Sequence, residues 1–359
     1  MPDFAPLTVA AVHRETPDAV IVDLVVPDEL RESYRHRPGQ HLAVRAVLGG
    51  QELRRTYSIC SARADRLLRI AIKRVAGGGF SNWANDELAA GHTIESLPPA
   101  GRFVVPPGDG TPRHLLAFAA GAGITPVIGM VREALETEPE TRVTLVYGNR
   151  TPETILFSGE LEDLKDRHLG RFTLLNVLSR NEESDAPLFE GRITADKVNA
   201  LADRLIDLDG VAHVFLCGPG SFIKETRNAL IARGVGKERI HHEFFAPGGG
   251  AYRPAPKPEA APAADAKGAE AVAILDGVRR SFKVPAGQHV VDAALAAGIR
   301  VPYSCKGGMC CTCRAKVVEG SAEMTVNYSL EPWEIEAGFI LTCQAVPTSA
   351  RIVLDYDQM

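Results

Sequence analysis

Hydrophobic and polar positions alternate in short runs over the first hundred residues of the chain. Turn residues separate these runs, as in an antiparallel sheet that closes on itself. The runs predicted to be strands are Leu7–Val12, Ala19–Val26, His41–Val47, Arg54–Ile59, Leu67–Val75 and Thr93–Leu97. One short helix is expected at about residues 81–88. The pattern therefore predicts an antiparallel β-barrel domain over residues 1–110.

After residue 113, apolar runs of strand length alternate with segments of helical period. The predicted strands are Leu115–Ala119, Val143–Tyr147, Phe172–Val177 and Val214–Cys217. The predicted helices are Pro126–Glu136, Glu160–Arg167, Ala195–Arg204 and Ser221–Arg233. This alternation is typical of a parallel sheet with helices on both faces, here an α/β domain over residues 111–246.

Residues 247–270 break the pattern with five prolines, four glycines and no hydrophobic period. Such a segment cannot bury a core, so we expect an exposed linker. Beyond it, Ala271–Leu275 and Val278–Val284 form a predicted hairpin around Asp276-Gly277, and Val290–Ala297 a predicted helix. Residues 271–359 are thus expected to form a small α+β domain.

Cysteine spacing gives the strongest chemical signal in the sequence. Of seven cysteines, Cys305, Cys310, Cys313 and Cys343 follow the pattern C-x4-C-x2-C-x29-C. That is the plant-type spacing for the ligands of a [2Fe–2S] cluster. A structural zinc site is the alternative, although zinc ribbons usually carry two C-x2-C knuckles and only one is present. Cys311, between two of these ligands, is assigned no role.

Two segments of the predicted barrel suit a flavin. Arg55 offers paired donors to a pyrophosphate, Tyr57 a ring for stacking, and Ser58 a hydroxyl for the flavin N5. A glycine run ending in Ser81 opens the predicted helix and forms a natural phosphate seat. The strand-end motif and the glycine run are each weak evidence alone. Their order and spacing along the chain make a flavin site a stronger prediction. The predicted flavin-binding residues are Arg55, Thr56, Tyr57, Ser58, Ile72, Lys73, Val75, Gly77, Gly78 and Ser81.

Two motifs at predicted strand ends suit a nicotinamide nucleotide. Gly121 and Gly123 allow a diphosphate to approach the backbone, and Thr125 is expected to cap the helix with Pro126 in its first turn. The motif is not G-x-G-x-x-G, so the standard dinucleotide fingerprint does not apply. Cys217-Gly218-Pro219 follows another strand at the carboxyl edge, where ligands bind to such sheets.

Arginines near the third predicted strand of this domain bear on nucleotide choice. Ser179 and Arg180 end the strand, with Arg150 and Arg192 nearby in sequence. Arginine suits a 2′-phosphate, whereas a carboxylate suits a free ribose diol; Glu182 and Glu183 follow only later. We therefore expect NADPH rather than NADH, with solvated surface arginines as the alternative interpretation.

Overall composition is ordinary and limits the partners. The formal net charge of -5 does not point to nucleic acid or to an anionic membrane surface. Charged residues among the first thirty positions argue against a signal peptide, and the longest uncharged run, 115–131, is broken by glycine and proline. We expect a soluble protein of the reducing cytoplasm, where clustered cysteines serve a metal centre rather than disulfides.

The order of these motifs resembles the ferredoxin–NADP reductase superfamily fused to a C-terminal plant-type ferredoxin. The resemblance spans nearly all of the chain outside the linker. It implies FAD, with FMN left open, and a β-grasp-like ferredoxin domain. It implies flavin or nucleotide contacts at Arg55, Tyr57, Ser58, Gly78, Ser81, Gly121, Gly123, Thr125, Cys217 and Pro219. One departure is Phe222, where the family usually has methionine.

The tail narrows the resemblance further. Residues 327–331, 338–344 and 355–358 resemble the reductases that serve phenylacetyl-CoA epoxidation in bacteria. This implies a di-iron oxygenase as the partner. Glu243 and Phe245 match the family's segment near the flavin, where Phe245 either shields the ring or ends a buried strand.

The combined sites imply an NAD(P)H-dependent oxidoreductase that transports electrons. Nicotinamide delivers two electrons together and a [2Fe–2S] centre accepts one, so the flavin must mediate between them. Ser58, Cys217 and Glu243 are expected to position the nucleotide against the flavin. The alternatives are a reductase for another oxygenase, ring-hydroxylating or di-iron, and a non-enzymatic sensor with structural zinc.

Overall fold

The computed structural model describes residues 4–180, 186–245, 268–330 and 332–358. Contacts divide the chain into a larger unit, residues 4–53 and 57–249, and a smaller unit formed mainly by residues from 250 on. The predicted linker, residues 247–270, lies outside the described residues up to residue 267. Ala269 and Glu270, which we placed in that linker, belong to a strand instead.

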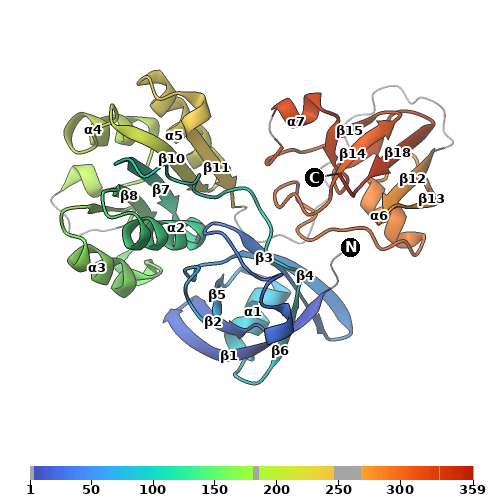
Figure 1. Cartoon of the computed structure of the whole chain (residues 1–359), viewed down its shortest axis with the longest axis horizontal. Coiled ribbons are helices and arrows are strands. Elements are labelled where there is room, and N and C mark those ends of the chain that lie inside the picture. The colour runs from blue at the N-terminus through green and yellow to red at the C-terminus, as the bar shows by residue number, and fades with distance from the viewer. Residues whose placement is uncertain (1–3, 181–185, 246–267, 331, 359) are drawn as a thin grey trace. The chain divides into compact units, whose positions relative to one another are not determined.

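The N-terminal domain is a six-stranded sheet in the order β4-β3-β6-β1-β2-β5 (Figure 1). An antiparallel bridge between Ile59, just after β4, and Ile70 of β5 joins the two edges of the sheet. Alternate side chains of these strands fill one core with Phe80 of the helix α1. The elements are β1 Ala5–Thr16, β2 Ala19–Val25, η1 Asp28–Leu30, β3 His41–Leu48, β4 Gln51–Ser58, β5 Leu68–Lys73, α1 Gly79–Asp86 and β6 Thr93–Ser96.

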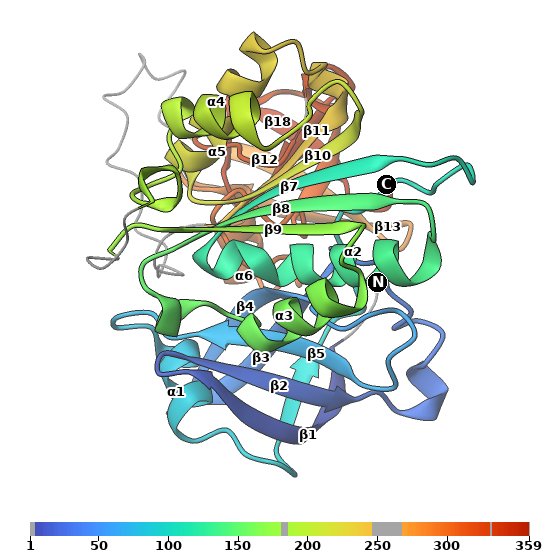
Figure 2. The same cartoon turned by 90° about the vertical axis from the view of Figure 1, so that its left-hand side faces the viewer.

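The second domain is a five-stranded parallel sheet in the order β11-β10-β7-β8-β9. Helices α2 and α3 cover one face and α4 and α5 the other, so two hydrophobic cores form (Figure 2). The strands are β7 His114–Ala120, β8 Arg142–Asn149, β9 Phe172–Leu178, β10 Val211–Gly218 and β11 Ile240–Phe244. The helices are η2 Gly121–Gly123, α2 Ile124–Thr137, η3 Pro152–Thr154, α3 Ser158–Arg167, η4 Pro187–Phe189, α4 Ala195–Arg204, α5 Gly220–Ala232 and η5 Lys237–Arg239.

The C-terminal domain has a five-stranded mixed sheet, β13-β12-β18-β14-β16, and a two-stranded sheet of β15 and β17. Its hydrophobic core includes Cys313 and Cys343. The elements are β12 Ala269–Leu275, β13 Val278–Val284, α6 Val290–Ala296, β14 Arg314–Glu319, β15 Ala322–Met324, α7 Pro332–Glu336, β16 Phe339–Leu341, β17 Ala345–Pro347 and β18 Arg351–Asp355. The predicted hairpin and helix are confirmed, whereas the elements after the cysteine loop were not predicted.

One predicted helix boundary is wrong. Thr125 does not cap α2, because the helix already begins at Ile124 and its N-cap position is Gly123, without a side-chain cap. The Thr125 hydroxyl instead donates to the Ala122 carbonyl oxygen at 3.0 Å. The preceding turn, Gly121–Gly123, is a 3-10 helix that leads directly into α2. Among the described residues, no helix has the length and apolar character needed to cross a membrane.

Candidate functional site

The predicted flavin-binding segments lie side by side in the barrel. Tyr57, at the end of β4, has its ring 5.7 Å from that of Phe80 in α1. Ser58 is buried beside it, with 4% of its surface exposed. At the helix start, an added Cβ on Gly79 would stand 2.9 Å from Leu53 Cδ1 of β4. The strand end and the helix N-terminus are thus brought together.

The glycine turn before α1 fits a phosphate group. The first N–H groups of any helix lack intrahelical partners, and Gly78 at the N-cap position provides no side-chain cap for them. A Cβ on Gly78 would stand 2.7 Å from Ser81 Oγ and 3.2 Å from the Val75 carbonyl oxygen, so the turn leaves little room for a side chain. Ser81 Oγ accepts a bond from the Val75 amide at 3.1 Å, which secures the turn to the end of β5.

The remaining residues predicted at the flavin site contribute unequally. Ile72 is fully buried in the barrel core, and its carbonyl oxygen accepts a bond from Asn85, so its side chain is not available to a ligand. Lys73 Nζ lies 3.5 Å from the Asp18 carboxylate. Arg55 and Thr56 lie on β4 before Tyr57. The aromatic ring offers a stacking surface, and the strand-end hydroxyl and the uncapped glycine turn offer hydrogen-bond donors. Together these groups fit a flavin with its pyrophosphate.

The two nucleotide motifs meet at the carboxyl edge of the parallel sheet. Strand β10 pairs with β7 on one side and β11 on the other, which sets Cys217 opposite Ala119 and Glu243. Gly121 has a φ of +53°, and nothing lies within 4 Å of where a Cβ would stand. Gly123 packs against Cys217, whose carbonyl oxygen would be 2.1 Å from a Cβ. The open face at Gly121 fits the close approach of a diphosphate.

Residues around Cys217 pack closely at this edge, where the nicotinamide is predicted to bind. Gly218 has a Phe222 ring atom 2.9 Å from its Cβ position, and the Phe245 amide donates to the Gly218 carbonyl at 2.9 Å. Cys217 itself is fully buried, and burial, together with Glu243, raises the pKa of its thiol. A bound nucleotide would therefore reach the thiol only after a local rearrangement.

His41 lies beside the predicted site residue Glu243, a contact that the sequence pattern did not reveal. It begins β3, is 3% exposed, and its Nδ1 lies 3.9 Å from Glu243 Oε1. Its Nε2 is buried without a hydrogen-bond partner. Burial lowers the pKa of His41 to about 4, so the ring is neutral at physiological pH. A single histidine in an apolar strand gave no signal of this contact, because β3 and β11 are about two hundred residues apart.

The predicted ribose-binding residues come together at the ends of β8 and β9. The Ser179 amide donates to the Asn149 carbonyl, and the Arg180 amide to the Arg150 carbonyl, each at 2.9 Å. The side chains of Arg150 and Arg180 are exposed there, as is that of Arg192. Glu182 and Glu183 lie outside the described residues.

The four predicted cluster ligands stand as two pairs of thiols. Cys305 is hydrogen-bonded to Cys310, and Cys313 to Cys343. The bond from Cys310 lowers the pKa of Cys305 to about 7 against the effect of burial, and the bond from Cys313 likewise lowers that of Cys343. The same bonds, together with burial, raise the pKa of the partner thiols Cys310 and Cys313. Each pair of thiols therefore shares a proton while no metal is bound.

The cysteine loop has a backbone that suits the wrapping of a cluster. Lys306, Gly308 and Cys311 all have positive φ angles. The Gly307 amide donates to Cys305 Sγ at 3.3 Å, and the Thr312 hydroxyl to Cys310 Sγ at 3.2 Å. Within the described ranges, no three His, Cys, Asp or Glu side chains surround a single metal-ion position. Two thiol pairs with hydrogen bonds to sulfur fit a centre of two irons, each taking two thiolates.

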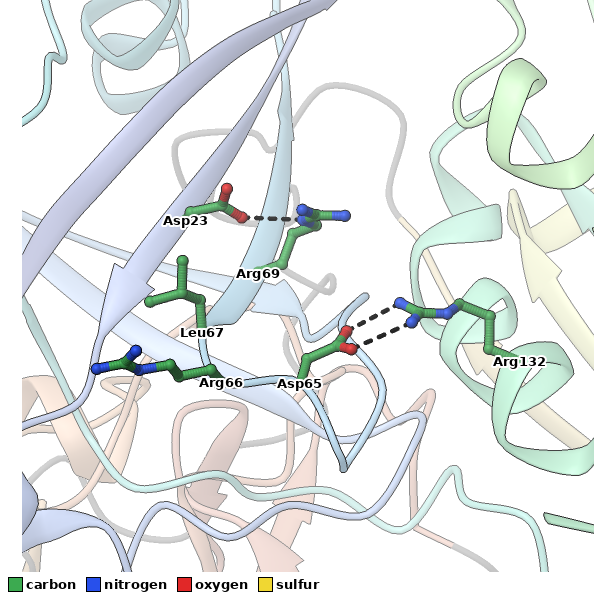
Figure 3. Close-up of a pocket in the computed structure, with 6 residues that line it drawn as sticks. All are labelled: Asp23, Asp65, Arg66, Leu67, Arg69 and Arg132. Carbon is green, nitrogen blue, oxygen red and sulfur yellow. Dashed lines mark hydrogen bonds and ion pairs between the residues drawn. The ribbon is translucent and has the colours of Figure 1, made fainter. Parts of the chain in front are cut away.

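A surface hollow of about 310 Å³ lies apart from all of these residues. It is lined by Asp23, Asp65, Arg66, Leu67, Arg69 and Arg132 (Figure 3). Its carboxylates are already paired, Asp23 with Arg69 and Asp65 with Arg132, each at 2.9 Å. None of the residues predicted to bind the flavin, the nucleotide or the cluster lines this hollow.

Family models match all three domains. The oxidoreductase FAD-binding domain matches residues 6–105, the oxidoreductase NAD-binding domain residues 118–228, and the 2Fe-2S iron-sulfur cluster binding domain residues 273–348. The last range contains all four paired cysteines. The three matches follow one another in the order expected from the motifs.

Similar proteins align with this chain over nearly its whole length. The chain is 40% identical to one of the subunits of 1,2-phenylacetyl-CoA epoxidase from Escherichia coli (strain K12), over 99% of both chains. It is 37% identical to the ferredoxin reductase component of 3-ketosteroid-9-alpha-monooxygenase from Rhodococcus rhodochrous, over 98% of this chain and 96% of that one. The solved phthalate dioxygenase reductase aligns with a TM-score of 0.58 at 25% identity, over 98% of each chain. The chain therefore belongs to the family of oxidoreductases that serve as reductase components of multicomponent oxygenases, with FAD-binding, NAD-binding and 2Fe-2S domains on one chain.

Proposed function

We propose that this reductase carries electrons from NADPH through FAD and its cluster to phenylacetyl-CoA epoxidase in the cytoplasm. The observation that carries the choice of partner is the 40% identity to a subunit of that enzyme over 99% of both chains. When bound, FAD accepts two electrons from the nucleotide, and a [2Fe–2S] centre passes them on singly. The thiol pairs supply the four ligands that such a centre takes, at Cys305, Cys310, Cys313 and Cys343.

The barrel residues are proposed to bind and orient the flavin. Arg55 and the N–H groups after Gly78 hold its pyrophosphate, with Thr56, Lys73, Val75, Gly77 and Ser81 along the same turn and strands. Tyr57 stacks on the ring system, since its own ring is only partly buried against Phe80. The hydroxyl of Ser58 lies next to it at the strand end and is proposed to hydrogen-bond N5.

The nucleotide residues are proposed to align NADPH at the sheet edge. Gly121 and Gly123 admit the diphosphate, and Pro126 fixes the first turn of α2 behind them. Arg150, Ser179 and Arg180 recognise the 2′-phosphate, because two exposed arginines stand together there. Cys217, Gly218, Pro219, Glu243 and Phe245 shape the nicotinamide end and exclude water from it.

Anaerobic titration with NADPH tests the electron route. We expect the flavin bands and then the broad cluster absorption to bleach in turn. A protein that carries flavin but whose iron–sulfur bands stay unbleached would contradict the route. Replacement of Arg180 by Ala tests nucleotide choice, because unchanged preference for NADPH over NADH would remove this residue from the site.

A second partner is favoured by the 37% identity to the 3-ketosteroid-9-alpha-monooxygenase component. The two choices are separated by mixing the purified reductase with each oxygenase and measuring product formed per NADPH consumed. We expect coupled epoxidation of phenylacetyl-CoA. Coupled turnover only with the steroid oxygenase would assign the reductase to that system.

A further inference from the structure

The last residues of the chain hold two other segments of the C-terminal domain. Strand β18 pairs with β12 and β14 in the centre of the sheet. Beyond it, the Asp357 carboxylate accepts hydrogen bonds from the amides of Asp276 and Gly277, both at 2.8 Å. These amides form the turn between β12 and β13. Asp357 therefore secures the hairpin of the domain.

Tyr356, next to it, points the other way, into the core that contains the cysteines. Its amide donates to the Ile274 carbonyl at 3.1 Å, and its ring packs against the hydrophobic core of the domain. Its hydroxyl oxygen lies 3.1 Å from Thr342 Oγ1. Thr342 is fully buried and directly precedes Cys343.

Thr342 connects this tyrosine to the second pair of thiols. Its hydroxyl donates to the Cys313 carbonyl oxygen at 2.8 Å, and its amide donates to the same oxygen at 3.1 Å. A threonine hydroxyl carries only one proton, and here that proton is given to Cys313. Tyr356 must therefore be the donor to Thr342. The series of hydrogen bonds thus runs from the phenol through the threonine hydroxyl to the cysteine carbonyl.

We propose that Tyr356 is a positioning residue for the iron–sulfur cluster, which acts through Thr342 on Cys313 and raises the reduction potential of the centre. The inference rests on the proposed role of the four cysteines as cluster ligands. Consecutive hydrogen bonds strengthen one another, so the phenol makes Thr342 a better donor to Cys313. The bond reaches the backbone carbonyl of Cys313, not its sulfur. Electron density withdrawn there lowers the negative charge beside the centre and so favours its reduced form, in the same sense as the hydrogen bonds to sulfur that help set cluster potentials.

The phenol lies against the core that contains this pair of thiols, and its ring packs on that core. Burial raises the pKa of Tyr356 above its usual value. The donor role of the hydroxyl follows from the geometry, because the only proton of the Thr342 hydroxyl is given to Cys313. Cys313 and Cys343 are each 3% exposed, so little solvent competes with this chain.

The test uses the full-length reconstituted reductase and its Tyr356→Phe variant, which keeps the ring and loses the donor. We expect full iron and sulfide content, an altered electron paramagnetic resonance spectrum of the reduced cluster, and a lower potential. At a fixed solution potential, the ratio of reduced to oxidised cluster should fall about threefold. This corresponds to a reduction potential lower by ~28 mV, at 59 mV per tenfold change for one electron. Thr342→Val should give at least the same shift, and the double variant no more than Thr342→Val alone.

Asp357→Asn is the matched control, because it weakens the neighbouring anchor of the same strand without touching the hydroxyl chain. It should lower the unfolding temperature of the domain and leave the potential and spectrum unchanged. An unchanged potential in Tyr356→Phe, or an equal shift in Asp357→Asn, would overturn the proposal. A wild-type protein that binds zinc in place of iron and sulfide would instead refute the proposed function, so the two failures are distinguishable.

Discussion

Burial sets the charge of His41, and that charge links stability to pH. The ring is held neutral because burial lowers its pKa to about 4, against an ordinary value near 6.5. Between these two values the unfolded chain binds a proton that the folded chain does not. The contribution of His41 to the free energy of unfolding is therefore fully present above about pH 6.5, and it is lost as the pH falls toward 4.

Replacement of His41 by Gln should flatten this part of the stability profile. A shift of this size corresponds to about 3 kcal/mol of unfolding free energy lost across the window. The midpoint of flavin release in urea, followed by fluorescence from pH 7.5 to 4, measures it. We expect the wild-type midpoint to fall more steeply with acid than that of His41→Gln.

The matched control for this prediction is His92→Gln, since His92 is exposed in the same domain. Its profile should follow that of the wild type. Parallel profiles for the wild type and His41→Gln would show that this ring does not carry the acid sensitivity.

The backbone around Gly123 leaves no room for a side chain. A methyl group there would stand 2.1 Å from the Cys217 carbonyl oxygen, a backbone atom that cannot move aside without shifting β10. Overpacking of this kind costs about 1–3 kcal/mol of folding stability. Because the strain moves Cys217 and Gly218 at the proposed nucleotide edge, we expect Gly123→Ala to lower kcat/KM for NADPH roughly tenfold, which corresponds to about 1.4 kcal/mol. Steady-state kinetics with ferricyanide as acceptor measure this.

Gly159→Ala serves as the control, because nothing lies within 4 Å of its Cβ position and the residue is in the first turn of α3. Flavin content should stay full in both variants. Wild-type kinetics in Gly123→Ala would mean that the edge between β7 and β10 is more tolerant than its geometry indicates.

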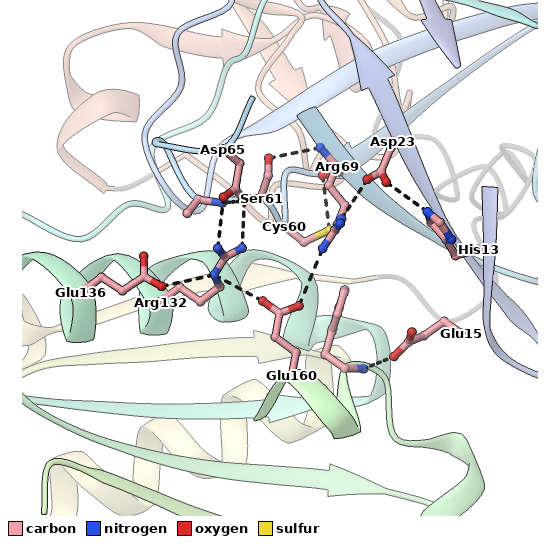
Figure 4. Close-up of polar contacts among 12 residues, drawn as sticks. His13, Glu15, Asp23, Cys60, Ser61, Asp65, Arg69, Arg132, Glu136 and Glu160 are labelled. Atoms are coloured by element: carbon pink, nitrogen blue, oxygen red, sulfur yellow. Dashed lines mark hydrogen bonds and ion pairs between the residues drawn. The ribbon is translucent and has the colours of Figure 1, made fainter. Parts of the chain in front are cut away.

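At the scale of elements, one network of charges joins the barrel to the nucleotide domain within the larger unit (Figure 4). Glu160 of α3 lies between two arginines, 3.4 Å from Arg132 of α2 and 3.9 Å from Arg69 of β5. Arg132 also binds Asp65, in the loop before β5, through both its terminal nitrogens. Burial raises the pKa of Glu160, whereas the arginines oppose the shift.

Replacement of Glu160 by Gln should loosen this junction. The change leaves two guanidinium groups with less compensation in a partly buried site, and we expect a loss of about 1–2 kcal/mol of stability. Urea unfolding at low and high salt measures the effect. The difference from wild type should shrink as salt rises, because screening weakens the lost interactions.

A control for the network is Glu162→Gln, an exposed carboxylate on the same helix. That variant should unfold within a few tenths of a kcal/mol of the wild type, as is usual for surface changes. If both variants lose equal stability, the effect belongs to α3 itself and not to the junction.

Elements with a strong period could be predicted from the sequence, and those without one could not. The predicted helix Ala195–Arg204 matches α4 residue for residue. In contrast, β16 spans only Phe339–Leu341, too short for any alternation to show. Threonine often caps helices, which made Thr125 the expected cap, yet the 3-10 turn before α2 moved the helix start forward.

The residues of the candidate site also differ in whether a local sequence pattern marks them. Cysteine spacing and glycine turns are local in sequence, so Cys305 and Gly121 could be proposed as site residues without a structure. The contact of His41 with Glu243, and the chain from Tyr356 to Cys313, join residues far apart in sequence. Only the approach of β3 to β11 and the course of the chain after β18 reveal them.

At the scale of the whole molecule, the family's three domains imply two separable half-reactions. The nucleotide and flavin residues belong to the barrel and the parallel sheet, and the four thiols to the C-terminal domain. Ferricyanide takes electrons from the flavin directly, whereas the oxygenase is served by the cluster under the proposed function. Loss of the cluster should therefore uncouple one activity from the other.

The variant Cys343→Ser removes the proposed ligand that comes from outside the cysteine loop. We expect loss of the cluster absorption, reduction of ferricyanide by NADPH within about twofold of wild type, and oxygenase-coupled turnover reduced at least about a hundredfold. Cys311→Ser is the matched control, because Cys311 lies in the same loop with its thiol bonded to Ser329 at 3.0 Å and is not a predicted ligand. This control should keep both the cluster and the coupled turnover. Coupled turnover that survives in Cys343→Ser would show that electrons reach the oxygenase by a route that bypasses the cluster.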